Sequence, residues 1–230
     1  MAVVRRIRCT VRDVRDHGER VYSVHLEPSL PVPRFTPGQF LHLALDPYDA
    51  DGFWPDSRVF SIASSPDART NLAITYAVKG AFTTRMEQEL IVGAVVWVKL
   101  PYGEFVIDPS RDAVLFAGGT GVTAFTAFLG SLLPEHARRI VLFYGARTTD
   151  LFVYGRLANG RAAAVLALTS HLVCEATDGR LDVDRAWPEI ERLSTPVCYL
   201  SGPPPTLVAL TAQLLGHGVP ADDVRIDAWE

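Results

Sequence analysis

A glycine cluster stands between an apolar run and the start of an expected helix. Residues 116–125 read F-A-G-G-T-G-V-T-A-F. The apolar run 113–117 predicts a strand, and the apolar residues of 122–133 predict a helix that begins just after the glycines. The amide groups and the dipole at a helix N-terminus favour an anion, and glycines let a phosphate approach the backbone closely. The pattern predicts a phosphate-binding turn, with a tight turn that binds nothing as the open alternative.

Two features narrow the kind of nucleotide that this turn would hold. Gly119, Gly121 and Ala124 fit the dinucleotide fingerprint G-x-G-x-x-A. No lysine follows Gly121, so the turn is not the P-loop of triphosphate-binding proteins. The next apolar run, 140–144, leads into Arg147, where the usual dinucleotide fold places an acidic residue. Because an arginine can meet a phosphate or a ribose, we expect a nucleotide to be held differently here.

A second group of polar residues occupies 58–66, which reads R-V-F-S-I-A-S-S-P. On an extended strand, Arg58 and Phe60 face one way and Ser61 faces the other. A cation, an aromatic ring and hydroxyl groups suit a ligand that combines phosphate with a planar ring. Taken singly, a surface ion pair explains Arg58 equally well, and a place in the core explains Phe60.

Composition limits the class of protein. A chain of 230 residues with 48% hydrophobic content can bury a core for one large or two small domains. The net charge of −4, without a basic run, argues against a nucleic-acid-binding protein. The first residues lack the apolar region of a signal peptide and no stretch has membrane-span length, so we expect an unexported, cytoplasmic protein. The three cysteines form no C-x-x-C pair, and we expect no metal site, iron–sulfur cluster or disulfide scaffold.

The two halves of the chain differ in their hydrophobic periodicity. Alternating β-type runs at 21–26, 40–45, 72–78 and 95–98 are separated by proline and glycine turns and predict an antiparallel β-barrel. Apolar strands then alternate with helical stretches, at 113–117, 140–144, 165–173, 197–201 and 224–229, which predicts a parallel α/β sheet. We place the boundary in 108–112, giving domains 1–108 and 109–230.

The motifs and their order resemble those of the ferredoxin–NADP reductase superfamily. The matching segments are R-V-F-S-I-A-S at 58–64, F-T-P-G-Q-F at 35–40, G-A-F-T at 80–83, P-Y-G-E-F at 101–105, G-G-T-G-V-T at 118–123, Y-G-A-R at 144–147 and S-G-P-P-P at 201–205. The resemblance covers most of the chain. It implies an FAD-binding antiparallel β-barrel domain followed by an NAD(P)-binding α/β parallel-sheet domain.

The resemblance also implies the residues of the site. Flavin contacts fall on Arg58, Phe60, Ser61, Ser64, Tyr76, Val78, Gly80, Phe82, Thr83 and Thr84. Nicotinamide dinucleotide contacts fall on Gly119, Thr120, Gly121, Thr123, Arg147, Arg180, Gly202 and Pro203. Ser61, Ser201, Asp227 and Trp229 fall at the reacting atoms, with Trp229 covering the flavin ring. Two positions depart from the family, since Phe60 replaces a tyrosine and Ser201 replaces a cysteine.

The resemblance implies an FAD-dependent NAD(P)H oxidoreductase that takes a hydride onto FAD and passes electrons to a separate acceptor. That acceptor would be a ferredoxin, a flavodoxin, an oxygenase component or a small molecule. A non-catalytic flavin- or nucleotide-binding regulatory module is the alternative. Arg147 and Arg180 match two positions of NADPH-specific relatives, but V-C-E at 173–175 stands where those relatives read S-R-E. The balance therefore favours NADH over NADPH.

Overall fold

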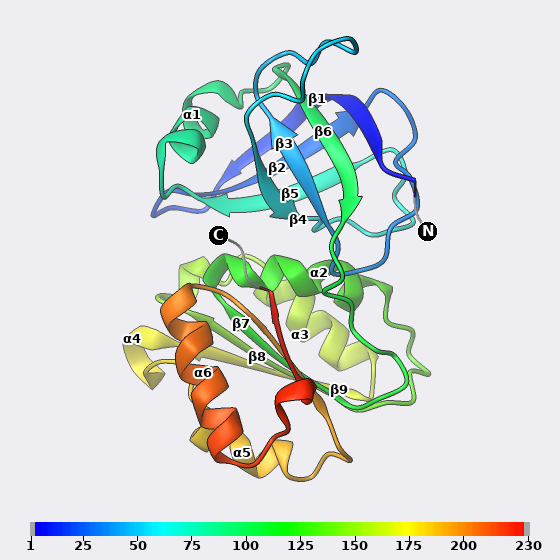
Figure 1. Ribbon diagram of the computed structural model, residues 1–230. Coiled ribbons are helices and arrows are strands. Elements are labelled where there is room, and N and C mark those ends of the chain that lie inside the picture. Colours follow the sequence, from blue (N-terminus) through cyan, green and yellow to red (C-terminus); the bar gives the residue numbers. More distant parts are fainter. Residues whose placement is uncertain (1–2, 228–230) are drawn as a thin grey trace. The chain divides into compact units, whose positions relative to one another are not determined.

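The chain forms two units, residues 1–106 and 107–230, and each contains its own sheet (Figure 1). The computed structural model describes residues 3–227. The first unit contains a six-stranded antiparallel sheet that is nearly closed, and the second contains a five-stranded parallel sheet with helices. The predicted fold class, an antiparallel barrel followed by an α/β parallel sheet, is confirmed. Over the described residues, no helix has the length and apolarity needed to cross a membrane.

The barrel strands run in the order β4-β3-β6-β1-β2-β5. They are β1 (Arg5–Asp16), β2 (Val21–Pro28), β3 (Phe40–Ala44), β4 (Ser57–Ser61), β5 (Leu72–Ala77) and β6 (Val95–Tyr102). The register brings Ile7 opposite Val98 and Val98 opposite Leu43, and all three side chains are almost completely buried. Just after β4, the amide of Ala63 donates to the carbonyl of Ala73 at 2.9 Å, which links the two edge strands. This bond nearly closes the sheet.

Two elements of the barrel unit were not among the runs identified from the sequence. Strand β1 buries Ile7, Cys9 and Val11, but arginines alternate with these residues and weaken the apolar signal. Helix α1 (Ala81–Glu89) follows β5 and occupies the segment that was interpreted only as a phosphate loop. Its Phe82 and Met86, one turn apart, are buried, so burial of one side fixes this short helix.

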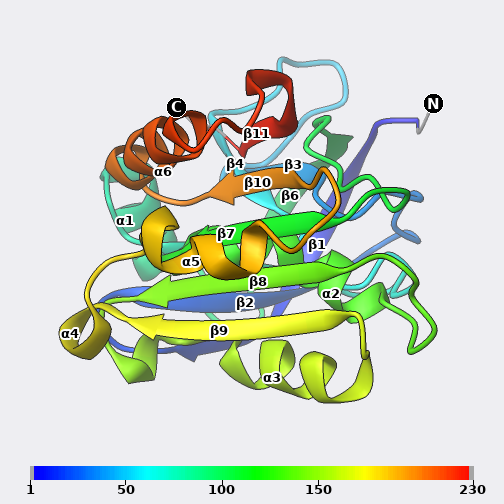
Figure 2. The same cartoon turned by 90° about the horizontal axis from the view of Figure 1, so that it is seen from below.

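The parallel sheet runs in the order β11-β10-β7-β8-β9 (Figure 2). Its strands are β7 (Ala113–Gly118), β8 (Ile140–Ala146), β9 (Leu168–Cys174), β10 (Val197–Ser201) and β11 (Val224–Asp227). The helical segments are η1 (Gly119–Val122), α2 (Thr123–Ser131), η2 (Thr149–Leu151), α3 (Gly155–Ala164), α4 (Glu175–Asp178), α5 (Val183–Ile190), α6 (Pro204–Gly216) and η3 (Ala221–Asp223). The chain passes from β7 through β8 to β9 and then returns to β10, on the other side of β7.

This return explains the layers of the second unit. Because parallel crossovers are right-handed, α2 and α3 lie on one face of the sheet, and the helices after the reversal lie on the other. Val114 and Phe116 pack with α5 and α6 in a single apolar core. The reversal leaves β7 and β10 as neighbours that lead to helices on opposite faces. Their carboxyl ends form the topological switch point, where open α/β sheets bind ligands.

The loops after β7 and β10 touch through their backbones. A Cβ atom at Gly121 would lie 2.3 Å from the carbonyl oxygen of Ser201 and 2.7 Å from the amide nitrogen of Gly202. Both neighbours are backbone atoms, so they cannot rotate away as a side chain can. Glycine is therefore required at position 121 for the two loops to approach, independently of any ligand.

We predict that Gly121→Ala lowers the free energy of unfolding by about 1–3 kcal/mol, because the added methyl overpacks the contact with Ser201. Urea denaturation measures this change. Gly130→Ala is the matched control, since a Cβ atom there meets nothing within 4 Å and alanine favours a helix. Equal stability of the two variants would contradict the required contact.

Candidate functional site

In the barrel unit, Arg58 reaches from β4 toward the first turn of α1. Its Nη1 donates to Asp56 Oδ1 at 2.7 Å and to the carbonyl of Ser57 at 2.8 Å. The guanidinium carbon lies 5.0 Å from the centre of the Phe82 ring. The Arg58 side chain is 52% exposed, so an anion has access to it. Arg58 and Phe82, both predicted flavin contacts, thus lie together.

Phe60 belongs to a row of aromatic rings that extends from β4 to β2. Its ring meets Tyr76 edge-on with centroids 6.2 Å apart, and Tyr76 stacks on Tyr22 at 5.6 Å. Tyr76 is only 3% exposed, and burial raises the pKa of its phenol, which keeps it neutral. Phe60 is half-buried. Half-buried Phe60 offers a ring face against which a planar ring can pack, and buried Tyr76 supports it.

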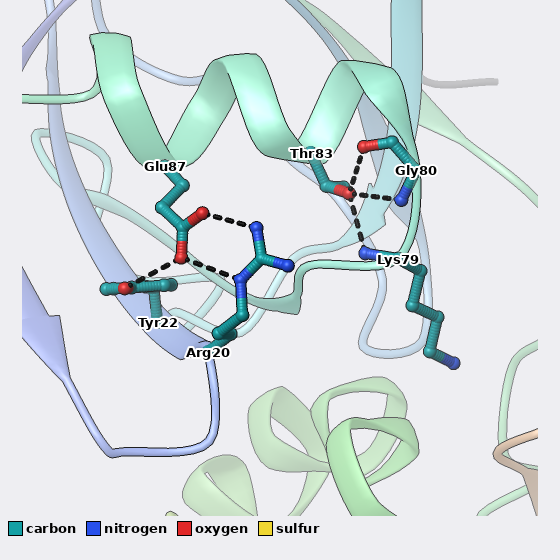
Figure 3. Close-up of polar contacts among 6 residues, drawn as sticks. All are labelled: Arg20, Tyr22, Lys79, Gly80, Thr83 and Glu87. Carbon is teal, nitrogen blue, oxygen red and sulfur yellow. Dashed lines mark hydrogen bonds and ion pairs between the residues drawn. The ribbon is translucent and has the colours of Figure 1, made fainter.

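The hydroxyl of Thr83 caps the start of α1 (Figure 3). Thr83 Oγ1 accepts hydrogen bonds from the amides of Lys79 at 2.9 Å and Gly80 at 3.1 Å, and it donates to the carbonyl of Gly80 at 3.1 Å. The amide of Thr84 donates to the same carbonyl. Amides in the first turn of a helix have no partner within that helix, so those of Ala81 and Phe82 are the donors suited to an anion.

Ser61, Ser64 and Val78 are further predicted flavin contacts of the barrel unit. Ser61 is 8% exposed and lies opposite Phe40 on β3. The buried hydroxyl of Ser64 has no hydrogen-bond partner within residues 3–227. A buried polar atom of this kind is normally satisfied, so the orphaned hydroxyl fits a bound polar group. The amide of Val78 donates to the carbonyl of Arg20 at 3.0 Å, which anchors the strand just before the Gly80 turn.

These groups fit a flavin nucleotide. An accessible guanidinium, first-turn amides and a hydroxyl suit phosphate oxygens, and the aromatic row suits the ring. The fit rests on the chemistry of the donors, which are brought together by β4, β5 and α1. Thr83, one of the predicted flavin contacts, also caps the start of α1.

In the second unit, the glycine turn leads through η1 into α2. Gly119 has φ +55°, and a Cβ atom there would meet nothing within 4 Å, so the backbone is open at this point. Thr123 Oγ1 donates to the carbonyl of Thr120 at 2.8 Å and fastens the first turn of α2. The turn thus presents amides at a helix N-terminus on the switch point, as a dinucleotide phosphate requires.

The second predicted loop at the switch point, after β10, has few backbone amides that could donate hydrogen bonds. Gly202 and Pro203 follow β10, and α6 begins with Pro204 and Pro205. Proline has no amide hydrogen, so the start of α6 offers few groups for a phosphate. Of the two loops, the turn before α2 therefore offers more amides suited to an anion.

Ser201 and Asp227 form a buried pair at the ends of β10 and β11. The parallel register places them opposite each other, and Ser201 Oγ donates to Asp227 Oδ2 at 2.9 Å. Each is 3% exposed. Cys198, on the same strand, is completely buried, and this burial raises its pKa to about 12, so it stays a thiol. Two of the three residues predicted for the reacting atoms in this unit, Ser201 and Asp227, thus lie together.

The two arginines predicted for the nucleotide are Arg147, just after β8, and Arg180, just after α4. The carbonyl of Arg147 accepts from the amide of Ala176 at 3.1 Å, which ties the end of β8 to α4. Arg180 Nε donates to Glu175 Oε1 at 2.8 Å, and the Arg180 side chain is 84% exposed. The structure therefore pairs Arg180 with a carboxylate.

Trp229, predicted to cover the flavin, lies outside the described residues.

Three interacting residues of the barrel unit were not predicted from the sequence. Arg20, Tyr22 and Glu87 join the turn before β2 and the start of β2 to α1 (Figure 3). Arg20 and Glu87 are 67 positions apart, and no local pattern relates residues at such a separation.

Known proteins resemble the chain in sequence, although no protein-family model matches it. The reductase component of phenol 2-monooxygenase from Pseudomonas sp. (strain CF600) is 32% identical over 137 residues, which are 57% of this chain and 37% of that protein. The ferredoxin–NAD(P)(+) reductase of Metapseudomonas resinovorans is 27% identical over 237 residues, covering 98% of this chain and 70% of that protein. The chain spans about two fifths of the length of the phenol hydroxylase proteins it matches.

Solved structures similar to the chain also include reductases. The ferredoxin reductase of carbazole 1,9a-dioxygenase has a TM-score of 0.76 and 26% identity, over 99% of this chain and 70% of that one. It has also been solved in an FAD apo form. A cytochrome P450 reductase from Amycolatopsis has a TM-score of 0.82 at 22% identity, over 99% and 70% of the two chains, which shows the shared fold. In its barrel, parallel sheet and ordered motifs, the chain is similar to the ferredoxin reductases and oxygenase reductase components of the ferredoxin–NADP reductase superfamily.

Proposed function

We propose that the chain is an FAD-dependent reductase that takes a hydride from NAD(P)H and passes electrons to a separate acceptor. The observation that supports this proposal is that each of the two units has its own group of donors suited to a phosphate. Arg58 and the start of α1 stand beside an aromatic row in the barrel unit. The glycine turn lies at the switch point of the parallel sheet. A flavin nucleotide suits the first site and a second dinucleotide suits the other.

In the barrel unit, Arg58 and the first-turn amides of α1 bind the flavin phosphates. Phe60 and Tyr76 border the ring, and the caps made by Thr83 keep the amides in place. Phe60 lacks a hydroxyl, so it contributes packing without a hydrogen bond to the flavin. Bound FAD supplies a group that accepts two electrons as a hydride and releases them singly.

In the second unit, the turn from Gly119 to Thr123 binds the pyrophosphate of the nicotinamide dinucleotide. Ser201 supplies a small polar contact, and Asp227 orients its hydroxyl by accepting a hydrogen bond from it at 2.9 Å. Hydride transfer requires the two rings to be in contact. We assign Ser61, Ser201, Asp227 and Trp229 to the surroundings of the reacting atoms.

The acceptor lies outside the two units. Cys9, Cys174 and Cys198 are separated in sequence, and all three are buried, so they are not placed to hold an iron–sulfur cluster. Several related proteins are named as reductase components of monooxygenases, which supports an oxygenase component or a ferredoxin as acceptor. A non-catalytic flavin- or nucleotide-binding regulatory module is the second candidate, favoured by Ser201 in place of the family's cysteine and by Phe60 in place of its tyrosine.

We predict that the FAD-loaded chain loses its oxidised flavin absorbance when NADH is added without oxygen. The chain's own turnover is then tested with an artificial one-electron acceptor, so that no natural partner is needed. Retention of the oxidised spectrum with both NADH and NADPH, in a chain that binds FAD, would favour the regulatory module.

Arg58→Ala is expected to weaken FAD binding roughly ten- to 150-fold, because a charge-assisted phosphate contact contributes about 1.5–3 kcal/mol. Fluorescence titration of the apoprotein with FAD measures the Kd. Arg12→Ala is the matched control, since Arg12 also forms an exposed pair on the barrel, with Glu27. If both variants bind FAD as the parent does, Arg58 is only a surface charge.

The end of β9 supports a preference for NADH. At the start of α4 the amide of Cys174 already donates to Asp178 Oδ2 at 2.8 Å, and Arg180 is held by Glu175. Carboxylates of the chain thus already accept hydrogen bonds from the amide and the guanidinium that a 2′-phosphate would need. An added phosphate dianion would meet repulsion here, whereas an acidic residue can accept a hydrogen bond from a free ribose hydroxyl.

Glu175→Gln should therefore raise the rate of flavin reduction by NADPH, relative to that by NADH, about fivefold, which is the effect of one exposed charge. The ratio of flavin reduction by NADPH and NADH, measured at low nucleotide concentration, gives the change. Glu135→Gln removes an exposed carboxylate elsewhere in the unit and serves as control. A parent that prefers NADPH, or an unchanged ratio in Glu175→Gln, would contradict this preference.

A further inference from the structure

The turn between β1 and β2 holds three consecutive residues in the left-handed region. Gly18, Glu19 and Arg20 have φ of 82°, 48° and 59°. Glycine adopts this conformation easily, but glutamate and arginine do so at a cost in free energy. Such a conformation persists where its surroundings hold it, and it is common at functional sites. The contacts of Arg20 show what this turn holds.

Arg20 contacts the segment around Gly80 at two points. Its carbonyl accepts from the amide of Val78 at 3.0 Å, before the Gly80 turn. Its guanidinium donates to Glu87 on α1 through Nε, at 3.1 Å, and through Nη2, at 2.5 Å (Figure 3). One residue thus fixes both the entry to α1 and the second turn of that helix.

Tyr22 holds Glu87 from a second direction. Its hydroxyl donates to Glu87 Oε1 at 3.0 Å. The Tyr22 ring stacks on Tyr76, which in turn meets Phe60. The hydrogen bonds from Arg20 hold the pKa of Glu87 below its ordinary value, so Glu87 is ionised at neutral pH and accepts from both partners. Arg20, Tyr22 and Glu87, here called the brace, link α1 to the aromatic row.

We propose that the brace positions the first turn of α1 beside Arg58 and thereby sets the affinity for the phosphates of FAD without contacting the cofactor. This inference rests on the proposed function. A surface ion pair alone would contribute little. The brace differs because its arginine is kept in an unfavourable backbone conformation, and because both of its attachments flank the amides of Ala81 and Phe82.

Arg20→Gly separates positioning from stability. Glycine eases the left-handed conformation at position 20, so the melting temperature of the apoprotein should hold or rise. The same change removes the guanidinium and frees α1. We expect the Kd for FAD to rise about tenfold, and the Kd for riboflavin, which has no phosphate, to change less than about twofold.

Two further variants extend the test, Arg20→Lys and the control Arg12→Ala. The lysine variant keeps one donor to Glu87 and should recover part of the FAD affinity, whereas Arg12→Ala should leave both Kd values unchanged. Unchanged FAD affinity in Arg20→Gly, or equal losses for FAD and riboflavin, would overturn the inference and leave the proposed function standing. A parent chain that binds neither FAD nor riboflavin would overturn both.

Discussion

The backbone contact between Gly121 and Ser201 is the constraint on which the nucleotide half of the molecule depends. No side chain fits between these two loops, so the turn after β7 and the turn after β10 meet at the switch point. The same contact places the start of α2 beside the end of β10. Register with β11 then fixes Asp227 against Ser201. A steric requirement at one glycine thus brings phosphate-binding amides and a buried polar pair to one edge of the sheet.

The distribution of proline and side-chain caps decides which helices can hold an anion. Helices α1 and α2 begin with residues that carry amide hydrogens, and threonine hydroxyls at Thr83 and Thr123 stabilise their first turns. Helix α6 also begins at the ligand-binding edge, but its opening prolines lack amide hydrogens. In α4, the carboxylate of Asp178 occupies the amide of Cys174. Helix position alone therefore does not make a phosphate site.

Arg58 and Arg180 at the proposed sites both have carboxylate partners in this structure, and their surroundings separate their roles. Arg58 bonds Asp56 through Nη1 only and faces the start of α1, which adds positive dipole and amides. Arg180 bonds Glu175 beside a helix of four residues that carries two acids. A diphosphate gains several donors at Arg58, whereas a 2′-phosphate at Arg180 meets two carboxylates. This contrast connects the charges of the site to the proposed preference for NADH.

Much of the fold follows from local pattern. The apolar runs that became β2, β3, β5, β6 and the five parallel strands, the turn before α2 and the order of the two sheets are all visible in the sequence, because periodicity and glycine placement act over a few residues. Strand β1 was missed because arginines interrupt its apolar residues, and α1 because its first turn reads as a loop. The roles of the site residues stay predictions, and Trp229 lies outside the described chain.

Only tertiary structure decided how the polar residues pair. The hydroxyl of Thr83, a predicted flavin contact, also closes the start of α1, since the backbone amides of Lys79 and Gly80 lie within its reach. Arg20 meets Glu87 across 67 positions, and Ser201 meets Asp227 through strand register. Sequence gives each group's chemistry and its local periodicity. Which groups share a hydrogen bond depends on distances that only the packed sheets and helices define.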